Sequence, residues 1–423
     1  MPSFAIHSTP QSSFSLCSAM RCAKCKSCYA ETKILAVILD LDGTLLNTEQ
    51  VTKDVLKDFL LRHGKVLDRK KEDDRLGMTQ KESAIAVVKD YELPLSPDQF
   101  IREITPMYQE KWAEAKALPG ANRLIMHLHK HGLPFALASN SLRKNIDAKI
   151  CYQQGWKECF SIILGSDQVK SGKPSPDIFL EAANRMGVDA GFCLVIEDSL
   201  VGVQAAKAAG MKVVAVPSLQ TEADRYFTAD SVLHSLLEFH PELWGLPPFE
   251  DWVDHALPIE PFNLQGLFRN GTLSEFADDG PSAFPDQVWG VYFGWAEVDM
   301  HEIFKVVVGI GWKHCFCTAQ RKIQLCLIDG SDDLVCNQKM QLLLVGYIRG
   351  FSSECAGMKR GRSRPKITWN EGKTMVDTEI LEEDMSIANA ALNLPMFAGL
   401  KHVPSFSEAS LVGSAVCDDK EQG

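Results

Sequence analysis

Short, uninterrupted apolar runs alternate with segments of helical period through the first half of the chain. Runs rich in Val, Ile and Leu that end beside polar residues are typical of strands buried on both faces of a parallel sheet. We expect strands at 34–39, 133–138, 160–164, 192–196 and 211–216, and helices at 121–131, 142–154, 175–186 and 199–209. The pattern predicts an α/β, Rossmann-like parallel sheet over residues 31–235.

Between Glu49 and Leu118 the alternation is interrupted by sequence of helical period. Residues 51–63 and 81–91 carry apolar side chains at three- and four-residue steps, as amphipathic helices do. We therefore expect a helical cap at about 49–118, inserted after the first strand. Its loop around Gly77 is expected to face the site of the parallel sheet.

Residues 236–261 are rich in Pro and aromatic residues and are interpreted as a linker. After them the residue pattern becomes typical of strands. Three segments then combine β-branched and aromatic residues with Gly breaks, as strands do. They are 288–296, 304–312 and 340–348, and helical character returns at 376–392. We predict a small antiparallel β-barrel domain over 262–395, with a tail at 396–423. The basic stretch 350–377 is interpreted as a solvated insertion rather than a nucleic-acid-binding arm.

The first 30 residues differ in composition from the rest, because they contain no acidic residue and many serines. They are interpreted as a disordered or targeting segment. Cys17, Cys22, Cys25 and Cys28 have metal-like spacing, but a zinc site needs four ligands on a folded frame, so coincidence is favoured.

Composition narrows the class of protein. The chain has 423 residues, a net charge of −11 and 45% apolar residues, which favours a globular protein of two or three domains and argues against nucleic-acid partners. No apolar run reaches the roughly 18 residues that a membrane span needs, so no membrane partner is expected. The 13 cysteines show no framework spacing, which favours a reducing compartment. A cytoplasmic protein is expected, with a plastid location as the alternative.

Four polar motifs appear in a fixed order, and three of them follow predicted strands. They are residues 40–44 (DLDGT), Ser139-Asn140, Lys173-Pro174 and Glu197-Asp198. Ligands of parallel sheets bind at the carboxyl ends of the strands, so these side chains should meet at one edge. Two Asp residues, an acidic pair and a lysine at one edge predict a phosphoryl-transfer site.

The residue types suit a covalent mechanism. Asp40 is the predicted nucleophile, Asp42 the predicted general acid and base, and Lys173 the predicted catalytic cation. Mg²⁺ is the expected cofactor, because two carboxylates that meet a phosphate need compensating charge. The expected metal residues are Asp40, Asp42, Asp198 and, through water, Glu197. The expected phosphate-binding residues are Gly43, Thr44, Ser139, Asn140 and Lys173.

Two structural alternatives to this interpretation fit the sequence less well. A calcium loop would need a third acidic residue before the glycine and a helix upstream, and residues 40–44 have neither. His127, His129 and His131 have alternating spacing on a predicted helix, which turns them to different faces. They are interpreted as part of a surface helix rather than as metal ligands.

The four motifs, with the inserted helices, resemble the haloacid dehalogenase superfamily of phosphatases over residues 34–220. That resemblance implies the same roles for Asp40, Asp42, Ser139, Lys173 and the acidic pair. Residues 117–121 (ALPGA) and 137–141 (LASNS) are more closely similar to the bifunctional riboflavin kinase/FMN phosphatases of plants. Mg-dependent hydrolysis of a small phosphomonoester, FMN above all, is the activity that this resemblance implies.

The second half resembles the riboflavin kinase part of the same enzymes at residues 290–296, 309–312, 345–349 and 391–395. ATP and riboflavin are the ligands implied for it. Two departures predict a degenerate kinase: the family's Pro-Thr-Ala-Asn segment, which holds Mg·ATP, is missing, and Gln324 stands where the family has its catalytic Glu. The segment 266–271 is similar to the family's glycine-rich phosphate loop.

Three hypotheses follow for the whole chain: a phosphatase with an impaired kinase half, an enzyme with both activities, and a phosphatase whose second half binds flavin without catalysis. Two explanations for the departures also stay open. The sequence has diverged, or non-coding segments have replaced coding ones near Asp254, Lys313 and Gly350. Sequencing the transcript separates these two.

Overall fold

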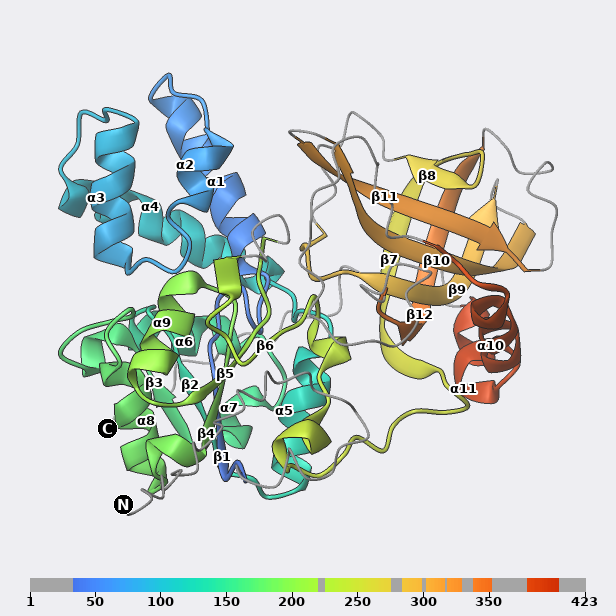
Figure 1. Ribbon diagram of the computed structural model, residues 1–423. Coiled ribbons are helices and arrows are strands. Elements are labelled where there is room, and N and C mark those ends of the chain that lie inside the picture. The colour runs from blue at the N-terminus through green and yellow to red at the C-terminus, as the bar shows by residue number, and fades with distance from the viewer. Residues whose placement is uncertain are drawn as a thin grey trace, which may run out of the picture. The chain divides into compact units, whose positions relative to one another are not determined.

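The computed structural model describes residues 33–219, 225–274, 284–298, 302–315, 318–328, 338–351 and 379–402 (Figure 1). Three predicted regions lie wholly or mainly outside these residues: the segment 1–30 with its cysteines, the basic stretch 350–377, and the tail from 403 onward. Among the described residues, no helix has both the length and the apolar character to cross a bilayer.

A six-stranded parallel sheet lies at the centre of the first half, with the strand order β3-β2-β1-β4-β5-β6 (Figure 1). The strands are β1 (Ala36–Leu39), β2 (Phe135–Ala138), β3 (Ile162–Leu164), β4 (Cys193–Glu197), β5 (Lys212–Ala215) and β6 (Ser231–Val232). The chain runs outward from β1 to β2 and β3, then returns to the other side of β1 with β4. Because the strand order reverses beside β1, the carboxyl ends of β1 and β4 form the edge where such sheets bind ligands.

Both faces of this sheet are covered, as the continuous apolar runs predicted. Val37 and Leu39 pack into one hydrophobic cluster, and Ala36 and Ile38 pack into a second one on the opposite face. The covering helices are α5 (Ala121–Lys130), α6 (Arg143–Ile150), α7 (Trp156–Cys159), α8 (Asp177–Met186) and α9 (Leu200–Ala208). The predicted parallel α/β domain is confirmed.

Four helices are inserted between β1 and α5 and form a cap with its own apolar core. They are α1 (Thr48–Arg62), α2 (Arg69–Asp73), α3 (Gln80–Asp90) and α4 (Pro97–Lys111). The chain enters and leaves the cap through neighbouring segments, which are joined by a hydrogen bond from Asn47 N to Lys116 O (2.9 Å). Helix α4 was not anticipated, although Ser96 and Gln99 form a capping box at its start.

The second half contains a closed barrel with the strand order β10-β11-β8-β7-β12-β9, whose neighbouring strands are antiparallel. The strands are β7 (Leu257–Arg269), β8 (Thr272–Ser274), β9 (Gly290–Val298), β10 (Glu302–Cys315), β11 (Thr318–Leu327) and β12 (Lys339–Arg349). Helices α10 (Glu382–Leu392) and α11 (Pro395–Ala398) pack on its outer face through residues such as Ala388, Leu392 and Phe397. The predicted barrel is confirmed.

The stretch 236–261, interpreted as a linker, is well packed at its beginning. Leu236, Phe239 and Leu246 are buried in the cluster that covers one face of the parallel sheet. Its last five residues, from Leu257, belong to β7. Pro258 and Pro261 concealed that strand from the sequence pattern, because proline is usually confined to strand ends and edges.

Candidate active site

The ends of β1 and β4 bring three acidic residues together. The two strands are neighbours, with Leu39 opposite Ile196, and the amide of Asp40 donates a hydrogen bond to the Ile196 carbonyl (3.1 Å). Asp40 therefore follows β1 at the level where Glu197 ends β4 and Asp198 begins the turn into α9. Sequence reasoning placed these residues at one edge, and the sheet register explains why.

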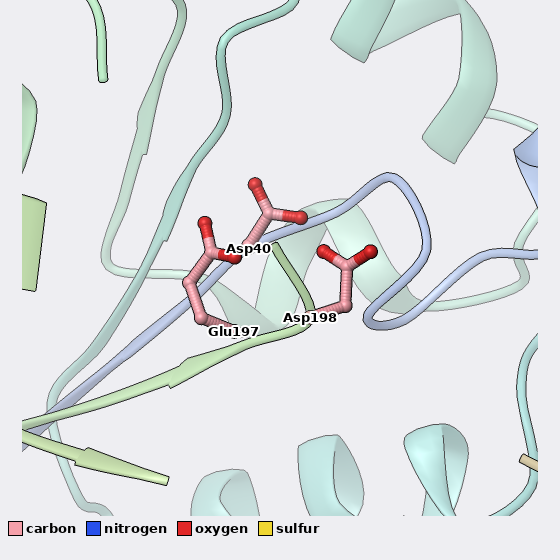
Figure 2. Close-up of side chains that lie close together, drawn as sticks. All are labelled: Asp40, Glu197 and Asp198. Carbon is pink, nitrogen blue, oxygen red and sulfur yellow. The ribbon is translucent and has the colours of Figure 1, made fainter. Parts of the chain in front are cut away.

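The three carboxylates form one buried cluster (Figure 2). One oxygen from each of Asp40, Glu197 and Asp198 lies within 4.8 Å of the other two. Their exposed fractions are 5%, 0% and 3%. No other group of three or more His, Cys, Asp or Glu residues within the described ranges has such a geometry.

Lys173 reaches the cluster from the loop before α8. Its Nζ lies 2.6 Å from Oδ1 of Asp40 and 2.5 Å from Oε1 of Glu197. The side chain of Asn140 fixes the lysine backbone, because it accepts a hydrogen bond from Lys173 N (2.8 Å) and donates one to Lys173 O (3.2 Å). Asn140 also donates to the Gly77 carbonyl of the cap (2.9 Å). The motifs at 139–140 and 173–174 are thus parts of one assembly.

One lysine does not neutralise three buried carboxylates. Burial raises the pKa of Asp40 to about 7, although Lys173 opposes the shift. Burial also raises the pKa of Asp198 well above its usual range, and the neighbouring carboxylates Glu197 and Asp40 raise it further. For Lys173, burial alone would lower the pKa, but the two carboxylates that it contacts raise it. The site therefore carries an excess of negative charge that a cation would relieve.

The donor set fits Mg²⁺, because hard cations bind carboxylate oxygens and the cluster offers oxygen donors alone. Glu197 is already engaged on both oxygens: Oε1 accepts from Lys173, and Oε2 accepts from the Ser199 amide (2.8 Å) and hydroxyl (2.9 Å). Asp40 and Asp198 are thus better placed to bind a metal ion directly.

Two glycines allow the carboxylates to approach the backbone. Gly43 has φ +83°, and a Cβ there would lie 2.3 Å from Oδ2 of Asp198. A Cβ at Gly202 would lie 1.8 Å from Oε1 of Glu197. Thr44 adds a hydrogen bond from its Oγ1 to Oδ1 of Asp198 (3.1 Å). The turn after β1 is therefore shaped around the cluster.

The carboxylate of Asp42 is not a member of the three-acid cluster. Its Oδ1 accepts hydrogen bonds from Lys149 Nζ and Thr48 Oγ1 (both 2.7 Å), and its Oδ2 accepts from Ser141 Oγ (2.7 Å) and Ser139 Oγ (3.3 Å). Burial raises the pKa of Asp42, but Lys149 and the hydroxyl donors outweigh it, so the net pKa is lowered. This carboxylate faces a lysine and hydroxyls instead of the other acids.

Lys149 is a functional candidate that sequence reasoning missed. It lies on α6 between the buried residues Ile146 and Ile150, and it is 7% exposed. A lysine on the buried face of a helix close behind the Ser139-Asn140 motif was the available signal, because lysines are rarely buried without a partner.

Four of the expected phosphate-binding groups make contacts within the protein. The Gly43 amide donates to the Leu46 carbonyl (2.9 Å), Thr44 bonds to Asp198, and the Asn140 side chain holds the backbone of Lys173. The Ser139 hydroxyl points to Asp42 and accepts from the Ser141 amide (3.0 Å). Their contact with a phosphate stays a prediction.

His127, His129 and His131 were expected to turn to different faces of a surface helix. His127 is buried, with Nε2 2.9 Å from the Pro247 carbonyl, while His129 is exposed. His131, however, packs against His127 with their ring centroids 4.5 Å apart, so only His129 turns to another face. The expectation that all three turn to different faces of a surface helix is therefore wrong for His127 and His131.

A cavity of about 240 Å³ joins the acidic cluster to the cap. Asp40, Asp42, Lys173 and Asp198 line one part of it, and cap residues 76–78 line another. The cap loop around Gly77 therefore faces the site, as predicted.

Comparisons with known proteins agree with this geometry. Residues 34–210 match the model of the haloacid dehalogenase-like hydrolases, and residues 278–353 match the riboflavin kinase model. The chain is 42% identical over 379 residues to the bifunctional riboflavin kinase/FMN phosphatase of Arabidopsis thaliana, covering 87% of this chain and 96% of that one. The chain belongs to the bifunctional riboflavin kinase/FMN phosphatase family. It is a hydrolase with a riboflavin kinase domain.

Other relatives match about half of this chain and are named for other substrates. A mitochondrial (DL)-glycerol-3-phosphatase of A. thaliana is 40% identical and covers 52% of this chain and 76% of that one. A probable pseudouridine-5′-phosphatase of Drosophila melanogaster is 37% identical and covers 52% of this chain and 97% of that one. About half of this chain is therefore similar to proteins named for different phosphomonoesters.

Proposed function

We propose that the first half hydrolyses FMN to riboflavin and phosphate, with Mg²⁺ as its cofactor. The similarity to a bifunctional riboflavin kinase/FMN phosphatase along nearly the whole chain carries this proposal. The buried cluster of Asp40, Glu197, Asp198 and Lys173 beside a cavity supports it. Glycerol 3-phosphate and pseudouridine 5′-phosphate are the competing substrates that the relatives suggest.

In the proposed mechanism, a carboxylate oxygen of Asp40 attacks phosphorus while the bond from phosphorus to the ester oxygen breaks. Asp42 gives a proton to the leaving oxygen, and then takes one from the water that attacks the aspartyl-phosphate. Because Lys149 lowers its pKa, Asp42 has to take up that first proton from solvent as the substrate binds. The attacking water releases phosphate and restores Asp40. Lys173 keeps the nucleophile in place, and Mg²⁺, when held by Asp40 and Asp198 and through water by Glu197, supplies positive charge to the phosphate oxygens.

A panel of phosphomonoesters tests the substrate. We expect kcat/KM for FMN to exceed that for glycerol 3-phosphate, pseudouridine 5′-phosphate and p-nitrophenyl phosphate by at least about tenfold, since discrimination depends on differential transition-state binding. Each substrate is assayed with Mg²⁺ and with a chelator. A preference for either competing substrate would overturn the assignment to FMN.

The Lys149 contact gives a test of the acid–base group. In Lys149→Met, Asp42 loses the cation that fixes its carboxylate, so we expect kcat to fall by roughly 10- to 100-fold with a smaller change in KM, as for other positioning defects. Lys144→Met is the matched control, because Lys144 is exposed on the same helix. Equal kinetics for the two variants would show that Lys149 does not act through Asp42.

We propose further that the kinase half phosphorylates riboflavin weakly or not at all. The segment 266–271, expected to be similar to a phosphate loop, continues strand β7 and ends in a two-residue turn. Asn270 and Gly271 have φ +48° and +71°, as in a tight hairpin. Gln324 lies on β11 opposite Gly309 and Thr272, and its neutral amide is not a base.

Loss of a general base costs about 10²–10⁴-fold in rate, so we expect ATP-dependent FMN formation to be at least 100-fold below ordinary enzyme turnover. The assay is best run in the Asp40→Asn background, where the product is not hydrolysed. Turnover of about 1 s⁻¹ or more would contradict the proposal. Quenching of riboflavin fluorescence without turnover would instead support the non-catalytic flavin-binding hypothesis.

A further inference from the structure

The cap end of the cavity contains a buried ion pair that no step of the proposed reaction uses. Glu72 and Arg75, on and just after α2, are 7% and 8% exposed, and both line the cavity. Nη2 of Arg75 donates to Oε1 of Glu72, and the Tyr91 hydroxyl donates to the same oxygen (2.9 Å). Burying two charges is costly, and an apolar pair of similar volume often stabilises a fold as well. Stability alone therefore does not explain why a charged pair lies at this end of the cavity.

The surroundings of the pair are apolar and partly aromatic. Leu56 of α1, Phe100, Ile104 and Tyr108 of α4, and Trp112 line the same cavity. Burial raises the pKa of the Tyr108 hydroxyl, and the neighbouring Glu72 raises it further, so this ring stays neutral. Such walls suit a flat, uncharged ring system better than a sugar or a glycerol chain.

The ion pair has unused hydrogen-bonding capacity on both partners. A carboxylate accepts about four hydrogen bonds, and those described for Glu72 in the resolved parts of the chain all reach Oε1. A guanidinium has five N–H donors, yet within the described residues Nη1 of Arg75 has no acceptor in hydrogen-bond range, and Asp90 lies 4.0 Å away. An acceptor oxygen, Oε2 of Glu72, and a buried donor nitrogen, Nη1 of Arg75, thus remain on the two side chains of one ion pair.

We propose that Glu72 and Arg75 recognise the imide edge of the substrate's heterocycle. In this arrangement the imide N–H donates to Glu72 and an adjacent carbonyl oxygen accepts from Arg75, as the N3–H and the C2 or C4 carbonyl of an isoalloxazine ring allow. The pair is neutral as a whole, so a second phosphate or a carboxylate would meet the negative charge of Glu72. This inference rests on the proposed function and names the substrate class for the same site.

The test compares two substrates of the wild-type enzyme. In 3-methyl-FMN a methyl group replaces the imide proton, so Glu72 would stay buried without that donor. Because an unpaired buried charged group is costly, we expect kcat/KM to fall by about 10- to 100-fold relative to FMN. p-Nitrophenyl phosphate, which lacks the imide, reports on the reaction itself.

A double variant provides the second arm. Glu72→Gln with Arg75→Met removes both charges at once and avoids leaving one of them unpaired. We expect FMN turnover to lose about 10- to 100-fold in kcat/KM, p-nitrophenyl phosphate to change less than threefold, and the distinction between FMN and 3-methyl-FMN to disappear. The control is Lys111→Met with Glu114→Gln, which removes an exposed cap pair whose atoms are 2.6 Å apart.

The outcomes separate this inference from the proposed function. If the wild type hydrolyses FMN and 3-methyl-FMN equally well, the imide contact is wrong although the FMN phosphatase stands. If it hydrolyses p-nitrophenyl phosphate but neither flavin, the proposed substrate is wrong. A double variant that loses both kinds of substrate alike contradicts the inference, and one that fails to fold leaves the wild-type comparison to decide.

Discussion

Replacing Asp40 by Asn is expected to reduce phosphate release by at least about 10³-fold, because the amide is not a nucleophile toward phosphorus. Asn has nearly the shape of Asp, and the change removes one of three crowded buried carboxyl groups. Lys173 keeps its 2.5 Å contact with Glu197. The variant should therefore fold at least as well as the wild type, which its thermal unfolding midpoint checks.

The matched control is Asp58→Asn, which makes the same change at an exposed position on α1 and should leave turnover unaltered. Phosphate release from FMN is measured for both variants with saturating Mg²⁺. Substantial hydrolysis by Asp40→Asn would show that another group attacks phosphorus, and the proposed roles of the whole cluster would need revision.

Removing divalent cations is expected to have the second largest effect. A chelator should lower FMN hydrolysis by at least about 10²-fold, and added Mg²⁺ should restore it, because Lys173 alone does not balance Asp40, Glu197 and Asp198. Ca²⁺ should restore it poorly, since it prefers more ligands at longer distances than Mg²⁺ does.

A binding measurement distinguishes a metal site from an unspecific salt effect. Mg²⁺ that binds the folded protein raises the thermal unfolding midpoint as its concentration increases. The rise should be absent or much smaller in Asp198→Asn, which removes a proposed ligand, and should persist in Asp58→Asn. Full activity in excess chelator, or an equal rise in both variants, would contradict the metal site.

The sequence predicts well which residues of the site follow the ends of strands. Apolar runs locate β1 and β4, and adjacency in a parallel sheet then brings Asp40, Glu197 and Asp198 to one edge. Lys173 was predicted to join them because carboxylates that meet a phosphate need compensating positive charge. These inferences depend only on the period of the chain and on the general rule for where parallel sheets bind ligands.

The sequence alone does not predict contacts that depend on how separate helices and strands pack together. The partner of Asp42 is Lys149, more than 100 positions away on α6, and the pair exists only once that helix packs on the sheet. Similarly, Glu72 and Arg75 are buried although both are charged, and their contacts include Tyr91 and Asp90, which lie at the end of α3.

Strands β7 and β11 were not predicted, and their own sequences explain why. Strand β7 contains two prolines, and β11 carries polar residues such as Arg321, Lys322 and Gln324 among its apolar ones. Neither gives the clean alternation that marks a half-buried strand. Closure of the barrel supplies the hydrogen-bond partners that these strands need, and that information is not local.

The central claim is that Asp40 carries the phosphoryl group during turnover, and mass spectrometry of acid-quenched enzyme tests it most directly. Wild-type protein is quenched while it hydrolyses FMN with Mg²⁺, digested, and searched for a phosphorylated peptide that spans β1. We predict one phosphoryl group on Asp40, lost on treatment with hydroxylamine and absent from Asp40→Asn. A phosphoryl group on any other residue, or continued turnover with none on the protein, would contradict the account.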